Sequence, residues 1–223
     1  MLANTITLYL NRGLFDFFSN FCYNIYRKLE RKEKNNMTGV ILFRAQPFHN
    51  GHLSMVKKAL DDALKYCGDL HIFVGSADKY GTKRNPLPIE FRMMLIKGAL
   101  HEVLSSEELH RVHIHPLNDL TDEADNSYAW GRYLFMKMLS YTHDPDMTIY
   151  YSDNPQIMLS WFDSEDRWCL RFKFLDRYEN ISATLVRSVL LEPTLKEGVL
   201  LNLVPNFVFM HRNEIVKYLK EAK

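Results

Sequence analysis

The sequence predicts an α/β fold in which a doubly wound parallel sheet is covered by helices on both faces. Short apolar runs of strand length alternate along the chain with segments at helical spacing, as in successive βα units. Polar motifs follow the ends of these runs, where open parallel sheets bind ligands. The chain has 223 residues, which is enough for one domain of ordinary size with a sizeable core.

The predicted elements can be placed in order along the chain. Strands are expected over residues 39–43, 69–75, 110–117, 147–151 and 170–175, where apolar side chains dominate. Helices are expected over residues 53–64, 91–99, 128–139 and 211–221, with another that begins after Ser182. In the second of these helices, the inward side chains are predicted to be Phe91, Met94, Leu95 and Ala99.

Residues 1–36 are interpreted as an N-terminal extension, separate from a domain that spans residues 37–223. Apolar side chains at helical spacing there predict an amphipathic helix for a membrane or partner surface. A non-native start upstream of the true one is favoured, because Met37 directly precedes the first predicted strand. Polar residues interrupt the apolar stretch before the roughly 18 residues of a spanning helix, so no stable membrane span is expected.

Composition excludes some classes of protein. Lys and Arg number 28 against 27 Asp and Glu, a formal net charge of +1, so no global field for nucleic-acid binding is predicted. The cysteines are Cys22, Cys67 and Cys169. Their odd number and lack of metal-like spacing predict free buried thiols in a reducing, cytoplasmic setting. The oligomeric state stays open, with a homo-oligomer among the options.

A tight turn with two histidines follows the first predicted strand. Residues 46–52 read QPFHNGH, and Asn50 and Gly51 separate His49 from His52 where the next helix begins. Free backbone N–H groups and the positive end of the helix dipole favour an anion there. A single histidine beside a turn would usually be a surface or capping residue, but two at this spacing after a strand indicate function.

A second motif lies near the other end of the chain, where residues 181–187 read ISATLVR. Ser182 is a candidate N-cap, with Thr184 and Arg187 early in the helix that follows. Hydroxyl groups and a fork-shaped guanidinium at a helix N-terminus suit phosphate oxygens. Alone, this segment could be an ordinary capped helix. Together, the two motifs predict a nucleotidyltransferase.

Residues 44–52, RAQPFHNGH, resemble the GRFQPFHxGH signature of the archaeal-type nicotinamide-mononucleotide adenylyltransferases, and residues 181–187 resemble their ISSTxxR signature. Segments 75–77, 85–87 and 151–155 stand in the order expected for that family, so the resemblance spans roughly residues 38–220. The chain departs from the family pattern at Phe43, Ala45 and Ala183. The resemblance implies a Rossmann-like sheet of the nucleotidyltransferase type.

The implied activity is transfer of the adenylyl group of ATP to nicotinamide or nicotinate mononucleotide, in NAD biosynthesis. His49, His52 and Arg187 are the implied catalytic residues. The other implied ATP-binding residues are Arg44, Gln46, Phe48, Gly51, Gly75, Asn154, Ile181, Ser182 and Thr184. Mg²⁺ is expected to bridge phosphate oxygens with few protein ligands, and no metal-ligand set is predicted in the protein. ATP and a mononucleotide are the expected partners.

The acceptor site is implied by an Asn-x-x-Trp element of the family. Trp130 is the predicted stacking platform for the acceptor ring, with Ser76, Asp119 and Asn126 nearby, although a core or surface tryptophan is the competing interpretation. Lys79, Lys83 and Arg84 either form a solvated loop or contact phosphate. Transfer to pantetheine phosphate, flavin mononucleotide or glycerol phosphate remains an alternative, as does a non-catalytic nucleotide-sensing module.

The other histidines give a weaker signal. His71, His113 and His115 fall on predicted strands without ligand-like partners, and they are expected to be structural or exposed.

Overall fold

The structure is a computed structural model that describes residues 37–66, 68–121, 127–162, 170–194 and 197–223. The predicted N-terminal extension, the acceptor candidate Asn126 and all three cysteines lie outside the described residues, so those predictions stay untested. Within the described ranges, no helix has both the length and the apolar character to cross a membrane.

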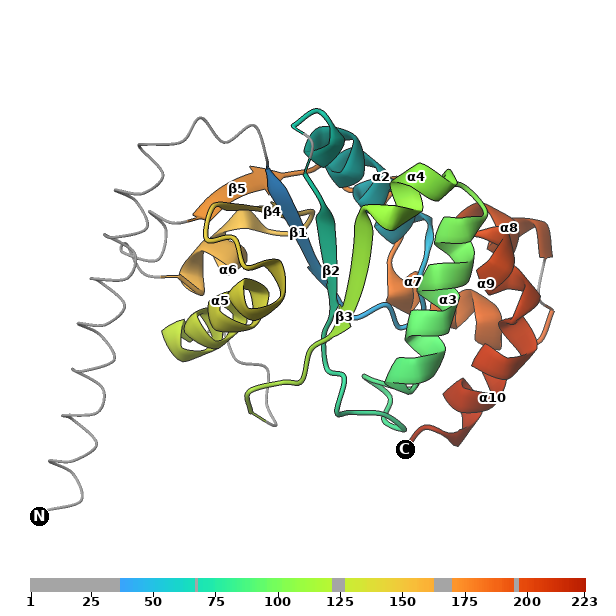
Figure 1. Cartoon of the computed structure of the whole chain (residues 1–223). Helices are drawn as coiled ribbons and strands as arrows, with labels where there is room; N and C mark the ends of the chain where they lie inside the picture. Colours follow the sequence, from blue (N-terminus) through green and yellow to red (C-terminus); the bar gives the residue numbers. More distant parts are fainter. Residues whose placement is uncertain (1–36, 67, 122–126, 163–169, 195–196) are drawn as a thin grey trace, which may run out of the picture.

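Five parallel strands form one sheet in the order β3-β2-β1-β4-β5 (Figure 1). The strands are β1 (Thr38–Phe43), β2 (Leu70–Val74), β3 (Val112–Pro116), β4 (Met147–Tyr151) and β5 (Leu170–Phe174). β2 is buried along its whole length, which explains its unbroken apolar character. Because β4 pairs with β1 rather than with β3, the strand order reverses between β1 and β4. The predicted fold class is confirmed.

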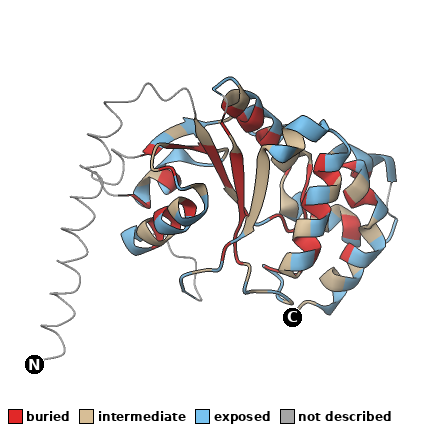
Figure 2. Ribbon diagram, viewed as in Figure 1, coloured by how far each residue is buried: buried red, intermediate tan, exposed pale blue. Residues whose placement is uncertain are grey.

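Helices cover both faces of the sheet (Figure 1). They are α2 (Asn50–Leu64), α3 (Ile89–His101), α4 (Ser106–His110), α5 (Tyr128–Thr142), α6 (Pro155–Ser160), α7 (Ala183–Leu191), α8 (Glu197–Leu203), α9 (Asn206–Met210) and α10 (Arg212–Glu221). Side chains of β1 alternate between two cores: Ile41 packs with α2, α3 and α7–α10, and Val40 packs with α5 and α6. Figure 2 shows the buried residues gathered where these helices meet the sheet.

One side-chain prediction and one boundary prediction were wrong. Met94 was predicted to face inward, but its side chain is exposed, and the buried face of α3 is instead centred near Arg92 and Ile96. His110 was placed at the start of the third strand, but it ends α4, and β3 begins at Val112. A capping box explains α4, because Ser105 and Glu108 each accept a hydrogen bond from the other's backbone N–H.

The prediction that His71, His113 and His115 lack ligand-like partners was also wrong. His71 and His113 are register partners on β2 and β3, and His115 lies two residues further along β3. The three rings contact one another, with centroids 4.7 Å apart for His71 and His113 and 5.1 Å apart for His71 and His115. Parallel pairing joins residues far apart in sequence, which linear spacing does not reveal.

Candidate active site

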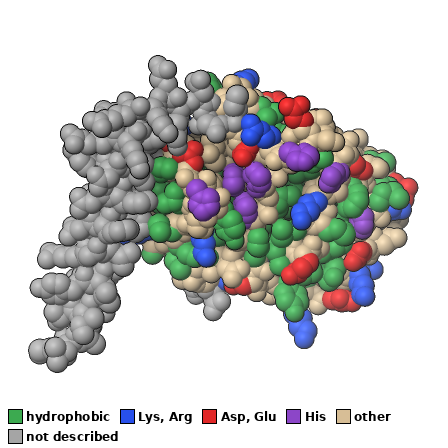
Figure 3. Space-filling view, viewed as in Figure 1, with side chains coloured by type: hydrophobic (Ala, Val, Ile, Leu, Met, Phe, Trp, Pro, Cys, Tyr) green, Lys and Arg blue, Asp and Glu red, His purple; other side chains and the backbone are tan. Residues whose placement is uncertain are grey.

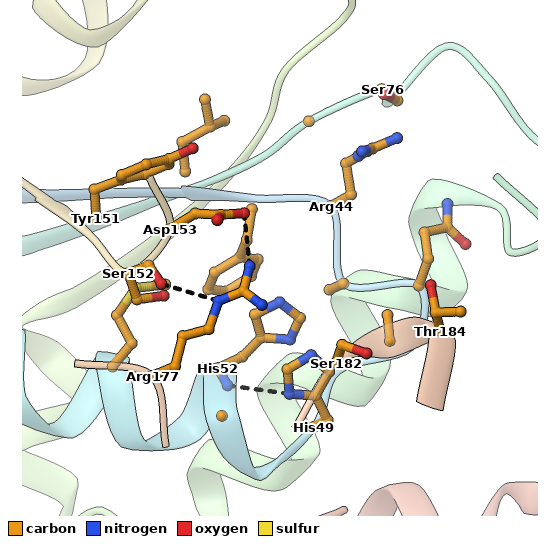
Figure 4. Close-up of a pocket in the computed structure, with 18 of the residues that line it drawn as sticks. Arg44, His49, His52, Ser76, Tyr151, Ser152, Asp153, Arg177, Ser182 and Thr184 are labelled. Atoms are coloured by element: carbon orange, nitrogen blue, oxygen red, sulfur yellow. Dashed lines mark hydrogen bonds and ion pairs between the residues drawn. The ribbon is translucent and has the colours of Figure 1, made fainter. Parts of the chain in front are cut away.

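A cavity of about 750 Å³ opens at the carboxyl ends of the strands, where the strand order reverses. The ends of β1 and β4 contribute Phe43 and Tyr151, and Gly75 and Leu175 directly follow β2 and β5. Both predicted motifs line this cavity, and Figure 4 shows residues from each. The sequence prediction that the two motifs meet at one ligand site is consistent with this geometry.

The two histidines begin α2 and stack on each other. His49 is the N-cap, and its Nδ1 accepts a hydrogen bond of 3.4 Å from the backbone N–H of His52. Because Nδ1 accepts, the proton of the neutral ring lies on Nε2, which is then a donor. The ring centroids of His49 and His52 are 3.7 Å apart. Phe43 and Phe48 pack on His52, at centroid distances of 4.5 Å and 5.6 Å.

Both imidazoles are held neutral. Burial, together with the smaller effect of the nearby Arg177 cation, lowers the pKa of His49 to about 4. Burial and the neighbouring His49 hold the pKa of His52 well below its usual value. The Nδ1 atom of His52 is inaccessible and has no hydrogen-bond partner among the described residues. At neutral pH, each ring therefore offers an N–H dipole rather than a full charge.

Gly51 gives the histidine pair its room. A Cβ at this position would lie 3.0 Å from both Cε1 and Nδ1 of His49, and 3.4 Å from the carbonyl oxygen of Ile181. A side chain there would push the His49 ring or the second motif aside. The glycine between the histidines is thus required by the close approach of the two motifs at the N-terminus of α2.

The second motif begins α7. Ser182 is its N-cap, as predicted, and accepts a hydrogen bond of 3.2 Å from the backbone N–H of Leu185. Arg187 donates to Thr184 Oγ1 at 3.2 Å and to the carbonyl oxygen of Gln46 at 2.8 Å. The guanidinium of Arg187 thus ties the two motifs together while it lines the cavity.

The cavity carries a local positive charge that the composition conceals. Its cationic lining residues are Arg44, Lys58, Lys79, Arg84, Arg177 and Arg187. Its acidic lining residues are Asp119, Asp153 and Asp176. Six cations against three carboxylates favour a polyanion, although the whole chain has a net charge of only +1. Burial is the main cause that lowers the pKa of both Arg44 and Arg187.

Sequence reasoning missed Arg177, which lies beside the histidines. Its Nη2 is 2.7 Å from Asp153 Oδ2, and its Nε donates to the Ser152 carbonyl oxygen at 3.3 Å (Figure 4). An arginine seven positions after the start of β5 has no distinctive spacing. Only the pairing of β4 with β5 brings it to the cavity.

Sequence reasoning also missed Arg92, a fully buried arginine behind the cavity. Its Nη1 donates to the carbonyl oxygens of Arg44 and Gly75, and its Nη2 donates to that of Ser76, each at 2.8 Å. Two residues in this region adopt left-handed backbone: Ala45 has φ 52° and Ser76 has φ 50°. Such conformations cost about 1–3 kcal/mol each. Arg92 offsets this cost by anchoring both loops.

The predicted acceptor side has two tryptophans. Trp130 lines the cavity, as does Trp161, with the two rings edge to face at a centroid distance of 6.2 Å. Gly131 allows this approach, because a Cβ there would lie 1.8 Å from the Trp161 carbonyl oxygen. Asp119 also lines the cavity; it accepts a hydrogen bond from Ser76 Oγ at 3.1 Å and pairs with Lys79 at 3.3 Å.

Three predicted or open candidates do not line the cavity. Phe48 is fully buried behind His52, so it supports that ring instead of touching a ligand. Asn154 caps α6, its side-chain oxygen accepting a hydrogen bond from the backbone N–H of Gln156. Lys83 lies outside the lining, whereas Lys79 and Arg84 belong to it.

Gln46 does line the cavity, but its amide is occupied. Its Oε1 accepts a hydrogen bond of 2.9 Å from the Leu87 N–H, and its Nε2 donates to the Leu87 carbonyl oxygen at 3.3 Å. The side chain therefore joins the first motif to the loop before α3.

We expect the free energy of unfolding to fall as pH is lowered from about 6.5 towards 4. Burial lowers the pKa of His49, His71 and His115 to about 4, so between these pH values the unfolded chain binds more protons than the folded one. The stabilising contribution of each histidine is fully present above its pKa in the unfolded chain, and it is lost as pH falls through its pKa in the folded chain. Full protonation of His49 alone lowers the free energy of unfolding by roughly 3 kcal/mol. Urea titrations of the wild type and His49→Gln measure this, and a flat wild-type profile would contradict it.

A family model described as cytidylyltransferase-like matches residues 44–189. The nicotinamide-nucleotide adenylyltransferase of Saccharolobus solfataricus is 29% identical over 115 residues, which is 52% of this chain and 58% of that protein. The enzyme of the same name from Methanolobus tindarius is 32% identical over 115 residues, covering 52% and 56%. The chain thus spans little more than half the length of these curated relatives.

Solved structures show the same fold. A bifunctional NMN adenylyltransferase/ADP ribose pyrophosphatase from Francisella tularensis, complexed with AMP and a Mn ion, has a TM-score of 0.61 at 19% identity. The match covers 82% of this chain and 52% of that one. The Plasmodium falciparum nicotinic acid mononucleotide adenylyltransferase complexed with NaAD has a TM-score of 0.55 at 10% identity, with coverages of 82% and 97%.

Proposed function

The chain belongs to the cytidylyltransferase-like family, and we propose that it transfers the adenylyl group of ATP to nicotinamide or nicotinate mononucleotide. The products are pyrophosphate and NAD⁺ or its deamido form. One observation carries the proposal: two stacked imidazoles and six cationic side chains meet at a cavity beside the N-termini of α2 and α7. The similarity to archaeal nicotinamide-nucleotide adenylyltransferases supports the choice of acceptor.

The proposed reaction needs positioning more than acid–base chemistry. A phosphate oxygen of the mononucleotide attacks the α-phosphorus of ATP and forms the new P–O bond. The bond between that phosphorus and the oxygen that bridges to the β-phosphate breaks, and pyrophosphate leaves with the electron pair. A phosphate monoester is already anionic near neutral pH, so no general base is required. The protein must hold two polyanions together and stabilise charge in the transition state.

The described residues suit these tasks. His49 would donate its Nε2–H to the triphosphate, and His52 would act at the α-phosphate, beside the free N–H groups that begin α2. Arg187, Ser182 and Thr184 would hold the β- and γ-phosphates from the N-terminus of α7. Neutral imidazoles fit this role, because they stabilise developing charge as dipoles without competing with the arginines for the ground-state triphosphate.

Mg²⁺ belongs to this proposal as the partner of the triphosphate. Two of the three lining carboxylates already pair with cations, Asp119 with Lys79 and Asp153 with Arg177. Such a donor set does not form a protein cage for a metal. It fits a Mg²⁺ ion that keeps most of its contacts to water and phosphate, with Asp119, Asp153 or Asp176 as protein ligand. The ion would neutralise charge on the triphosphate.

Trp130→Leu is expected to raise KM for the mononucleotide about 2- to 10-fold, with little change in KM for ATP. Stacking on a flat ring contributes about 0.5–1.5 kcal/mol beyond area burial, and leucine cannot supply it. Steady-state kinetics with each substrate varied in turn measures the split. Trp130→Phe is the matched control, because it keeps a ring in the same core and should retain most of the affinity. Trp130 is buried in the core beside α5 and α6, and equal rises in both KM values would mean that it acts only through this packing and not by stacking on the acceptor.

The decisive experiment is an acceptor panel. The protein is incubated with ATP and Mg²⁺ and one of nicotinamide mononucleotide, nicotinate mononucleotide, flavin mononucleotide or pantetheine phosphate, and pyrophosphate is measured. Glycerol phosphate is tested with CTP. Release with a pyridine mononucleotide, with the dinucleotide as co-product, is the expected result. Release with another acceptor alone would reassign the substrate. Nucleotide binding without release in any reaction would favour a sensing module.

A further inference from the structure

A second cluster of polar side chains lies at the edge of the sheet, outside the cavity. Asp69 directly precedes β2, His71 lies on β2, and His113 is its register partner on β3. One ligand-type atom from each of the three lies within 4.8 Å of the others. None of these residues lines the active-site cavity. Figure 3, drawn from the same side as Figure 1, shows histidine side chains gathered near the centre of the visible face, over β2 and β3.

We propose that Asp69, His71 and His113 bind a divalent first-row transition metal, with Zn²⁺ as the best-suited ion. Asp69 Oδ2 and His113 Nε2 are 3.3 Å apart. Tetrahedral Zn²⁺ has bonds of about 2.0–2.2 Å to nitrogen and oxygen, which places neighbouring ligand atoms about 3.3 Å apart. This pair is therefore already at the spacing that one shared ion requires.

The third ligand is held by a hydrogen bond of the kind found behind metal-bound histidines. His71 Nδ1 and His115 Nε2 are 3.0 Å apart, so Nε2 of His71 is the nitrogen left for an ion. A ligating histidine generally donates its other ring N–H to an acceptor, and here the Nδ1–H of His71 would donate to His115 Nε2 and fix the orientation of the ring. His115 in turn packs on Tyr141 of α5, with ring centroids 4.2 Å apart. The supporting ring is thus itself anchored.

The donor set determines the metal. Two imidazole nitrogens and one carboxylate oxygen suit Zn²⁺, Co²⁺ or Ni²⁺, whereas Mg²⁺ and Ca²⁺ prefer oxygen ligands alone. Asp69 Oδ1 also pairs with Arg111 at 2.8 Å, so Oδ2 is the carboxylate oxygen left for the ion. The Arg111 cation offsets the negative charge of the Asp69 carboxylate. The site would therefore not compete for the Mg²⁺ that accompanies ATP.

The proposed ion would fasten the edge of the sheet. β3 is one of the two edge strands and is only partly buried, and among the described residues it pairs with β2 alone. A metal held by residues on both sides of this pairing would add a cross-link between them. Because only the folded chain places the ligands together, binding would stabilise the fold by mass action.

The test uses the full chain after chelator treatment, titrated with Co²⁺ and followed by its visible absorption, then with Zn²⁺ by calorimetry. His113→Ala and Asp69→Asn should each weaken Co²⁺ binding at least tenfold. His101→Ala, which removes an exposed histidine of α3, and His52→Asn, which alters the active-site pair, should leave binding unchanged. Mg²⁺ in excess should not displace Co²⁺. A Zn²⁺ concentration one hundred times Kd should raise Tm by about 5–10 °C, except in His113→Ala.

The possible failures are distinct. Co²⁺ binding that survives His113→Ala and Asp69→Asn but is lost in His52→Asn would place the ion at the active-site histidines and overturn the proposal. No binding at all would also overturn it, and would leave the contacts of Asp69 with Arg111 and His113 as ordinary polar contacts. Turnover with ATP should be unchanged in His113→Ala, so the metal test is independent of the proposed function.

Discussion

His52→Asn is expected to lower kcat by about a hundredfold or more, with a smaller change in KM for ATP. Removal of one preorganised donor to developing charge costs about this much in other enzymes. Asparagine retains a polar group near the inaccessible Nδ1 position but has no counterpart of Nε2, so it removes the part of the ring proposed to act at the α-phosphate. Because the imidazole stabilises charge that grows in the transition state, kcat should carry the loss.

Steady-state pyrophosphate release and a thermal melt of each variant measure this effect. His101→Ala is the control, since it removes an exposed imidazole from α3 and should keep full activity. The fold of His52→Asn must also be verified, because Phe43 and Phe48 pack on the replaced ring. A folded His52→Asn protein with near-normal kcat would remove the central role given to this residue.

Arg92→Lys is expected to lower both stability and activity, although it preserves the charge. Lysine cannot reproduce a fork that donates at 2.8 Å to the carbonyl oxygens of Arg44, Gly75 and Ser76. At least one buried carbonyl group would lose its partner, at about 1–3 kcal/mol each. The free energy of unfolding should therefore fall by about 2–4 kcal/mol.

Activity should fall in the same variant because Arg44 and Ser76, which line the cavity, belong to the two loops that Arg92 anchors. Without that anchor, these two residues would lose their fixed positions. A tenfold or larger loss in kcat/KM is expected, measured beside urea unfolding. Lys97→Ala provides the comparison, since Lys97 is an exposed cation on the same helix. Arg92 has its pKa lowered to about 10, chiefly by burial, and remains a cation at neutral pH. Wild-type values for Arg92→Lys would show that the anchoring is dispensable.

The sequence predicted the elements whose signals are local. The turn before α2 and the cap of α7 are each contained in seven consecutive residues, so the backbone groups they satisfy lie nearby in the chain. Ser182 caps α7 as expected, and His49 and His52 begin α2. Ser127 is the N-cap of α5, so Trp130 lies in the first turn of that helix, and its side chain lines the cavity.

The misplaced side chains depend on distant partners. Met94 was predicted to face inward, and Arg92 was not among the predicted inward side chains. In the structure, carbonyl groups from two other loops pair with Arg92, so the buried arc of α3 rotates towards it and Met94 turns to solvent. Arg177 and the Asp69 cluster likewise depend on strand pairing, which periodicity within one segment does not encode.

The hydrogen bond from Arg187 to the carbonyl oxygen of Gln46 joins residues 141 positions apart. Closing so long a loop carries an entropic cost, and contacts of this separation slow folding. During synthesis, the histidine turn leaves the ribosome long before α7 exists to complete it. The proposed binding site for the triphosphate is therefore completed only once α7 has joined the histidine turn, and nucleotide would stabilise only chains that have folded that far.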